Sequence, residues 1–289
     1  MPAALIDGRA RARVLTETAA ARAAVLAEKG VVPRLAVVVV GDDPAGLSYS
    51  ASRTRALAAA GMEGREFRLP ADAGEARVLE AVAALGADPA VHGILVQFPL
   101  PADLDAGRIA AAIDPAKDVD CANPVSVGNM ALGRGGFLPC TPAGIMEIIR
   151  GEGIPTRGAR AVVVGRSDVV GRPLATLLSG RGADATVTLC HSATADLGGH
   201  TSLADILILA AGSPGFVTAD MVRPGATVID AGISRMPDGS IRGDAAESVA
   251  QVAGRITPVP GGVGPVTAAM LLSNLVRAAE EQHGRLQTG

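Results

Sequence analysis

The stretch "RAVVVGRSDVVGRPLATLLSGRG" (160–182) predicts a buried strand, a glycine turn and a helix in direct succession. Gly165 and Gly171 stand six residues apart, so the turn does not carry the G-x-G-x-x-G dinucleotide fingerprint. Further strands are predicted in "ATVTLCHS" (185–192), "ADILILAAG" (204–212) and "ATVIDAGIS" (226–234). This succession predicts a Rossmann-like parallel sheet, which binds ligands beyond the carboxyl ends of its strands.

The first half of the chain shows the same alternation. Predicted helices cover 8–29, 48–61 and 75–88, and predicted strands cover 35–41, 65–70 and 91–101. Ser48 is a candidate N-cap for the second helix, and Gly61 suits the position just after its end. Strands alternating with helices indicate a doubly wound parallel sheet, so we expect an α/β protein throughout.

Two stretches lack helical or strand periodicity. Residues 114–142 read as one long loop, and loops of that length inside a domain are usually functional. A helix is then predicted with Thr141 as N-cap and Pro142 at its first position. The string "TPVPGGVGPVT" (257–267) is too rich in proline and glycine for a helix or central strand. It is either a rigid hinge or a place where backbone approaches a ligand closely, and a final helix follows.

Composition narrows the function classes. The net charge is −3 and no basic run tracks a phosphate backbone, so nucleic acid is not expected as a partner. The longest aliphatic runs are too short to cross a bilayer, and no signal peptide is expected. Three widely spaced cysteines form neither a disulfide framework nor a zinc pattern, which favours a reducing cytoplasm.

Three side chains stand out as candidate ligand contacts. Arg166 and Ser192 directly follow two predicted strands, where an arginine and a hydroxyl could hold the 2′-phosphate of NADP. A solvated arginine on a glycine turn is an equally good interpretation of Arg166. Asp120 could accept hydrogen bonds from a planar heterocycle, although a lone aspartate more often shapes a turn. The four histidines are scattered, so neither a metal site nor a Ser/His/Asp triad is predicted.

Taken together, these strings resemble the bifunctional methylenetetrahydrofolate dehydrogenase/methenyltetrahydrofolate cyclohydrolase family over nearly the whole chain. The matching pieces are "GDDPAGLSY" (41–49), "GILVQFPLP" (93–101), "KDVD" (117–120), "CTPAGI" (140–145), "VVVGRSDVVGRP" (162–173), "HS" (191–192), "VIDAGI" (228–233), "GD" (243–244) and "ITPVPGGVGPVT" (256–267). The last string is highly specific, and so is the combination in this order.

The resemblance implies two α/β domains with a cleft between them. A folate-binding domain is expected over 1–139 plus 266–289, and a Rossmann-like NADP-binding domain over 140–265. It also implies a cytoplasmic homodimer of one-carbon metabolism that acts on tetrahydrofolate derivatives. The candidate catalytic residues are Tyr49, Arg53, Gln97 and Asp120; the candidate substrate contacts are Tyr49, Gln97, Pro99, Asp120, Gly261, Gly262 and Pro265. The candidate cofactor contacts are Thr141, Gly165, Arg166, Ser167, Val170, Gly171, Ser192, Ile233 and Thr267.

The chain departs from the family pattern at two positions. The family's Tyr-x-x-x-Lys motif reads "YSASR" here, so Arg53 stands where a lysine is expected, and Tyr49 keeps its place as the ring that stacks on folate. Cys121 stands where glycine is expected after "DVD". Hydride transfer needs orientation against NADP, whereas opening the methenyl ring needs proton transfers. Arginine cannot act as a base, so we expect the dehydrogenase to survive better than the cyclohydrolase.

Two other interpretations stay open. The protein could bind folate and nucleotide without turnover, an idea that Arg53 alone favours. It could also be a dehydrogenase of similar architecture that acts on a different small molecule.

Overall fold

The computed structural model describes residues 2–41 and 53–288. Two compact units emerge: one contains Met1–Arg13 and Thr141–Thr267, the other Val14–Cys140 and Ala268–Gly289. We call them the large-sheet unit and the small-sheet unit. The sequence-based prediction assigns residues 1–13 to the folate-binding domain, and that functional assignment stays a prediction. In the structure, these residues pack with the large-sheet unit.

The large-sheet unit is built on a parallel sheet whose described strands have the order β1-β11-β8-β7-β5-β6. Its strands are β5 (Arg160–Val164), β6 (Thr186–Cys190), β7 (Ile206–Leu209), β8 (Thr227–Asp230), β11 (Arg255–Ile256) and β1 (Ala4–Leu5). Its helices are α6 (Cys140–Gly151), α7 (Gly171–Ser179) and α8 (Leu197–Thr201), with short 3-10 turns at Ala219–Met221 and Glu247–Gln251 and a small hairpin of β9 (Ser234–Arg235) and β10 (Ile241–Arg242).

The predicted strands of this half are confirmed, and β-branched runs explain them. In β5 and β7 nearly every residue is buried, as in sheets covered on both faces. Helix α7 packs against β5 and β6 through Leu174 and Leu178, which are one helical turn apart. The sequence did not predict β1, which pairs with β11 although the two strands lie far apart in the sequence.

The small-sheet unit has a parallel sheet of described order β3-β2-β4. Its strands are β2 (Arg34–Val40), β3 (Glu63–Leu69) and β4 (Gly93–Val96), and its helices are α3 (Glu75–Ala87), α4 (Ala106–Ala111), α5 (Pro124–Ala131) and most of α1 (Gly8–Glu28) and α9 (Val263–Thr288). Residues 53–59 are also helical, and Gly61 after them has φ +70°, as expected just past a helix end.

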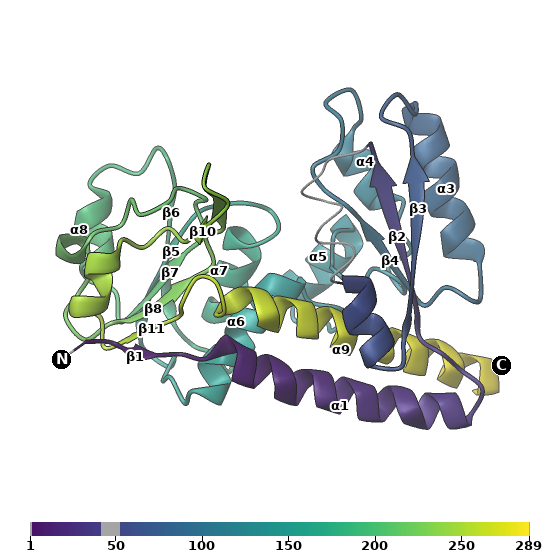
Figure 1. Ribbon diagram of the computed structural model, residues 1–289, viewed down its shortest axis with the longest axis horizontal. Coiled ribbons are helices and arrows are strands. Elements are labelled where there is room, and N and C mark those ends of the chain that lie inside the picture. Colours follow the sequence, from purple (N-terminus) through teal and green to yellow (C-terminus); the bar gives the residue numbers. More distant parts are fainter. Residues whose placement is uncertain (1, 42–52, 289) are drawn as a thin grey trace. The chain divides into compact units, whose positions relative to one another are not determined.

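Alternation along β2 sends its side chains into two cores. Leu35, Val37 and Val39 pack with residues of α1 and α9, whereas Ala36 and Val38 pack with residues of α3 and α4. Figure 1 shows α1 and α9 running side by side, and the Arg22–Glu280 ion pair joins them. The small sheet is therefore covered on both faces, which is why β2 is apolar from Leu35 onward.

Three sequence predictions need correction. Residues 114–142 are not one loop, because Asn123 caps and Pro124 opens helix α5 within them. Helix α6 begins at Cys140, so Thr141 lies inside its first turn and is not its N-cap. The last residues of 257–267 belong to α9, because a proline such as Pro265 is tolerated in a first helical turn.

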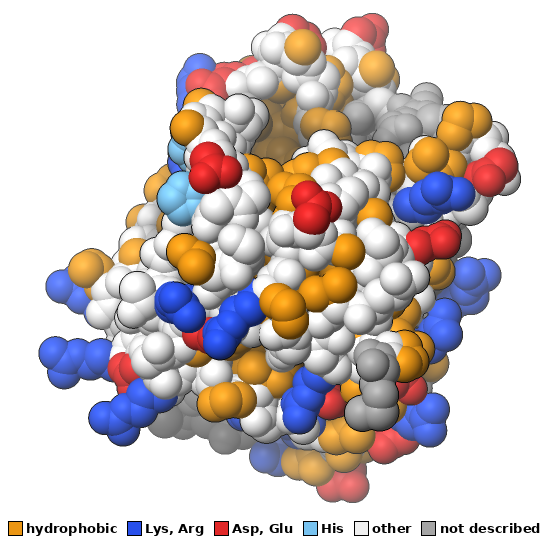
Figure 2. All heavy atoms as spheres, turned by 90° about the vertical axis from the view of Figure 1, so that its left-hand side faces the viewer, with side chains coloured by type: hydrophobic (Ala, Val, Ile, Leu, Met, Phe, Trp, Pro, Cys, Tyr) orange, Lys and Arg blue, Asp and Glu red, His pale blue; other side chains and the backbone are white. Residues whose placement is uncertain are grey.

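The surface carries both signs of charge. On the face shown in Figure 2, acidic and basic side chains are interspersed, which agrees with a net charge of −3. No helix among the described residues is both long and apolar enough to cross a membrane.

Candidate active site

The carboxyl edge of the large sheet carries most of the predicted cofactor residues. Strands β5 and β6 pair in parallel with Val164 opposite Cys190, so Arg166 and Ser192 each lie two residues beyond paired positions. Both side chains are exposed, as is Ile233, which follows β8. The structure therefore brings these three predicted contacts to one edge of one sheet.

The turn between β5 and α7 requires its two glycines. Gly165 has φ +122°, and a Cβ there would lie 2.1 Å from the Ala210 carbonyl oxygen. A Cβ on Gly171 would lie 1.8 Å from the Gly165 carbonyl oxygen. Ser167 Oγ accepts the amide of Val170 at 3.2 Å. The glycines thus serve the close packing of strand, turn and helix.

Arg166 is the basic group of this turn that suits a ligand phosphate. Its guanidinium takes part in none of the ion pairs recorded among the described residues, whereas the neighbouring Arg172 pairs with Asp168 at 2.6 Å. No acidic side chain directly follows β6, where His191 and Ser192 stand instead. This arrangement fits a dinucleotide with an extra phosphate better than one with a free ribose diol.

Two buried aspartates, whose role the sequence did not reveal, support the same edge. Asp244 Oδ2 accepts the Ala211 amide at 2.6 Å, and its Oδ1 accepts the Ser213 amide at 2.7 Å. Asp230 accepts the amides of Gly232 and Ala245 at 2.9 and 2.8 Å. Burial raises the pKa of Asp230, and these amides counteract the rise. Both carboxylates hold the loops that follow β7 and β8 in one shape.

The loop before α9 is packed at its glycines. Gly261 has φ +113°, and a Cβ on Gly262 would lie 2.6 Å from the Pro258 carbonyl oxygen. A Cβ on Gly8 would in turn lie 1.8 Å from the Gly262 carbonyl oxygen. The backbone angle of Gly261 and the packing around Gly262 therefore explain why both residues are glycines. Gly261, Gly262 and Pro265 all belong to the large-sheet unit.

The structure also joins two predicted cofactor residues that are far apart in sequence. The Oγ1 atoms of Thr141 and Thr267 lie 3.3 Å apart, and Thr267 Oγ1 also donates to the Val263 carbonyl at 3.2 Å. The two hydroxyls therefore form one polar pair between the first turns of α6 and α9.

In the small-sheet unit, Arg53 and Gln97 meet. Arg53 is only 7% exposed, and its Nη1 lies 3.5 Å from Gln97 Oε1, a long hydrogen bond. Gln97 directly follows β4, and its amide donates to the Val38 carbonyl at 2.9 Å. The arginine is thus a buried, permanently charged group beside the end of a strand.

Asp120 lies near this pair. Its Oδ1 accepts the Cys140 amide at 2.9 Å, which satisfies a helix-start amide of α6 from twenty residues away. Burial raises the pKa of the Asp120 carboxyl, the Cys140 hydrogen bonds oppose that rise, and the charge of Arg53 opposes it too. The structure therefore places Arg53 beside Gln97 and near enough to Asp120 for its charge to act on that carboxyl.

Position 121 explains why glycine is the expected residue there. Cys121 has φ +55°, in the left-handed region that favours glycine, and its side chain is buried. Burial raises the pKa of its thiol to about 12, and burial likewise raises the pKa of the Cys140 thiol. Both thiols are protonated at neutral pH, so neither has the thiolate character of a nucleophile.

The remaining candidates are placed as follows. Pro99 is exposed two residues beyond Gln97. Tyr49 lies outside the described residues. Within the described part of the chain, no group of three or more His, Cys, Asp or Glu side chains is arranged to hold a metal ion.

Comparison with known proteins also divides the chain into two parts. Residues 6–120 match the family model for the tetrahydrofolate dehydrogenase/cyclohydrolase catalytic domain, and residues 139–283 match the model for its NAD(P)-binding domain. The bifunctional protein FolD of Azoarcus sp. (strain BH72) is 50% identical over 285 residues, covering 97% of each chain.

Solved structures agree across the whole length. The chain is similar to the bifunctional FolD enzyme of Campylobacter jejuni, with a TM-score of 0.93, 42% identity and coverage of 96% of this chain and 98% of that one. It is also similar to the Trypanosoma brucei enzyme solved with NADP and an inhibitor, with a TM-score of 0.92, 37% identity and coverage of 97% and 98%. The chain therefore belongs to the tetrahydrofolate dehydrogenase/cyclohydrolase family.

Proposed function

We propose that this protein oxidises methylenetetrahydrofolate to methenyltetrahydrofolate with NADP, and that its hydrolysis of the methenyl product to formyltetrahydrofolate is weak. Membership of the family over most of the chain supports the first part, because the similar Campylobacter jejuni protein is named as a methylenetetrahydrofolate dehydrogenase/cyclohydrolase. Arg53 in place of lysine carries the second part. NADP when bound supplies the hydride acceptor.

For the dehydrogenase step, the chain's own residues bind and orient. Arg166 and Ser192 hold the 2′-phosphate, while Gly165, Ser167, Val170, Gly171, Ile233, Thr141 and Thr267 complete the cofactor site. Asp120 accepts hydrogen bonds from the donor edge of the folate heterocycle, and Tyr49 stacks on its flat face. The remaining candidate substrate contacts are Gln97, Pro99, Gly261, Gly262 and Pro265. No proton has to be removed from the substrate when hydride leaves, so orientation is the main contribution.

For the cyclohydrolase step, Arg53 is the limiting residue. A buried lysine can lose its proton because burial lowers its pKa, whereas an arginine keeps its proton at any working pH. Arg53 can orient Gln97 and bias Asp120 by its charge, but it cannot take a proton from water. General acid–base help is typically worth about a hundred- to ten-thousand-fold, and a loss of that order leaves a nearly monofunctional enzyme.

A product assay tests both parts. The purified protein is mixed with methylenetetrahydrofolate and NADP, and NADPH, methenyl and formyl products are followed separately. We expect NADPH with accumulating methenyl product. Enzyme-dependent formyl product at a matching rate would show that another group replaces the lysine. Tight binding of both ligands without turnover would favour a binding protein. NADP binding without competition by a folate analogue would favour a different substrate.

We further propose that the protein is a cytoplasmic homodimer. The support for the dimer is family membership together with β3, which lies at one edge of the described small sheet with several of its side chains partly exposed. The support for the compartment is that all three cysteines are free. Sedimentation equilibrium should give twice the monomer mass, and a single-chain mass at micromolar concentration would contradict the dimer.

A further inference from the structure

Asn274 of α9 is a buried amide that joins two distant segments of the small-sheet unit. Asn274 is only 6% exposed. Its Nδ2 donates to the Val119 carbonyl at 2.8 Å and to the Leu138 carbonyl at 3.1 Å. The same nitrogen lies 3.7 Å from Cys140 Sγ. An amide nitrogen has two hydrogens, so its donor capacity is used by these two segments.

Both segments contact Asp120 directly. Val119 precedes Asp120 in the chain, and Cys140 donates its backbone amide to Asp120 Oδ1 at 2.9 Å. The Cys140 thiol also lies 3.5 Å from the Val119 carbonyl oxygen. Asn274 therefore binds the residue before Asp120 through the Val119 carbonyl. Through the Leu138 carbonyl it also binds the chain two residues before Cys140, whose amide donates to the Asp120 carboxylate.

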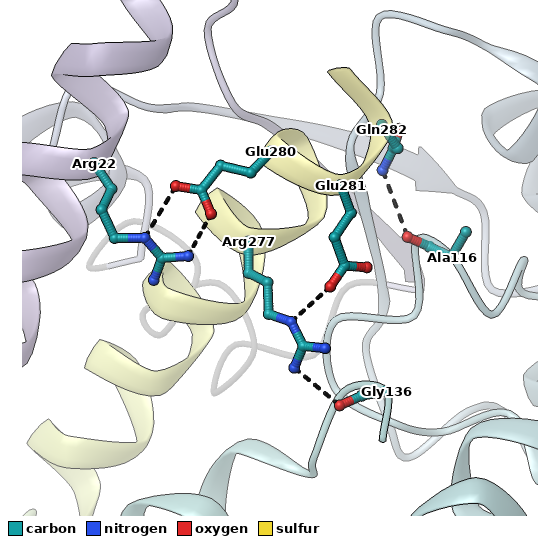
Figure 3. A network of polar contacts seen from close by, with 7 residues as sticks. All are labelled: Arg22, Ala116, Gly136, Arg277, Glu280, Glu281 and Gln282. Atoms are coloured by element: carbon teal, nitrogen blue, oxygen red, sulfur yellow. Dashed lines mark hydrogen bonds and ion pairs between the residues drawn. The ribbon is translucent and has the colours of Figure 1, made fainter. Parts of the chain in front are cut away.

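Two other side chains of α9 also bind backbone carbonyls of the small-sheet unit. Arg277 donates to the Gly136 carbonyl at 3.0 Å and lies over the Phe137 ring at 5.3 Å. Gln282 donates to the His92 carbonyl at 2.8 Å and lies 3.5 Å from the Ala116 carbonyl oxygen. Figure 3 shows Arg277 and Gln282 reaching from α9 to Gly136 and Ala116. Among these contacts, the bonds of Asn274 lie nearest to Asp120 in sequence.

We infer that Asn274 is a positioning residue, which keeps the Asp120 carboxylate in the orientation that binds the folate heterocycle. The inference rests on the proposed function, in which Asp120 accepts hydrogen bonds from that ring. Hydrogen bonds to a charged acceptor are directional, and a displacement of about 1 Å at a reacting group can cost about a hundred-fold in rate. Asn274 itself need not touch substrate.

The test replaces Asn274 by Leu, which has a similar volume and no donor. Ser273→Ala is the matched control, because Ser273 bonds only the Ala269 carbonyl within the same helix, at 3.1 Å. Binding of tetrahydrofolate and of NADP to the full-length protein is measured by calorimetry, and steady-state kinetics give KM and kcat. We expect Asn274→Leu to weaken tetrahydrofolate binding about ten-fold and to raise the folate KM more than it lowers kcat, with NADP binding unchanged.

A double-mutant cycle separates positioning from general loss of structure. If Asn274 acts through Asp120, Asn274→Leu weakens tetrahydrofolate binding much less in the Asp120→Asn background than in the wild type. Equal losses in both backgrounds, or wild-type folate binding by Asn274→Leu, overturn the inference while leaving the proposed function intact. Wild-type protein that binds no tetrahydrofolate refutes the proposed function, and the inference with it. Should Asn274→Leu not fold, Asn274→Ala, which removes the same two donor hydrogens with a smaller side chain, enters the same cycle and is judged by the same outcomes.

Discussion

At the scale of single residues, we expect position 53 to affect the two activities differently. Arg53 is buried, lies 3.5 Å from Gln97 and acts on Asp120 through its positive charge. An arginine stays protonated in proteins, so Arg53 cannot act as a base. We expect Arg53→Lys to raise the cyclohydrolase rate by about a hundred-fold or more and to leave the dehydrogenase rate nearly unchanged. Spectroscopic decay of methenyltetrahydrofolate measures the first, and NADPH formation measures the second.

Arg55→Lys is the control for that experiment. It makes the same chemical change two residues away at an exposed position of the same helix. An Arg53→Lys variant whose cyclohydrolase rate equals that of the wild type would show that position 53 is not the limiting departure from the family pattern.

Position 121 gives a second prediction at this scale. Cys121 adopts φ +55°, which costs a residue with a Cβ roughly 1–2 kcal/mol relative to glycine. Cys121→Gly and Cys121→Ala both remove the buried thiol, so the difference between them isolates the backbone term. We expect the glycine variant to unfold in urea with a free energy about 1 kcal/mol higher than the alanine variant. An alanine variant as stable as the glycine variant would contradict a left-handed backbone here.

At the scale of elements, His92 ties the start of β4 to β2 and α9. Its Nδ1 accepts the Arg34 amide at 3.1 Å, and its carbonyl accepts from Gln282 at 2.8 Å. Burial lowers the pKa of His92 below 6.5, and the charges of Arg34 and Lys117 lower it further, while Asp88 opposes them. The folded protein therefore favours the neutral ring, and Nδ1 keeps its lone pair for the amide.

The sign of the pH dependence follows from that shift. Well above pH 6.5 the ring is neutral in both the folded and the unfolded chain, so His92 imposes no penalty. As the pH falls below 6.5, the unfolded chain binds the proton first, and stability is lost until the folded pKa is passed. We expect His92→Asn, whose Oδ1 can replace Nδ1 as acceptor, to reduce the loss of unfolding free energy between neutral and acidic pH. A His92→Asn variant whose pH profile equals that of the wild type would contradict the assignment.

At the scale of the whole molecule, NADP should stabilise the protein by linkage. A ligand at a hundred times its Kd adds about 2.7 kcal/mol to the unfolding free energy of the unit that binds it. We expect NADP to raise the unfolding midpoint more than the same concentration of NAD does. Arg166→Gln should remove most of that difference, because Arg166 is an exposed cation just beyond the carboxyl end of β5. Equal shifts with NAD and NADP would contradict the assignment of the 2′-phosphate to Arg166 and Ser192.

Many features of the protein could be predicted from its sequence because they depend on neighbouring residues. The β-branched runs of β5, β7 and β8 identify buried strands without any knowledge of their partners. The glycines at 165 and 171 belong to one turn whose close packing is local. The string at 256–267 and the other matching strings identify the family, and Arg53, Gln97 and Asp120 are candidate site residues on that basis.

Other features depend on contacts between residues far apart in the chain, and only the tertiary structure decided them. The pairing of β1 with β11, the capping of the α6 start by Asp120 and the bonds of Asn274 to Val119 and Leu138 all join distant segments. Local propensity carries no information about such partners, because a buried amide or carboxylate is satisfied by whichever group the topology brings within hydrogen-bond distance. The sequence by itself therefore determined the family and its candidate residues, whereas the hydrogen bonds that hold the buried carboxylates were decided by the tertiary structure.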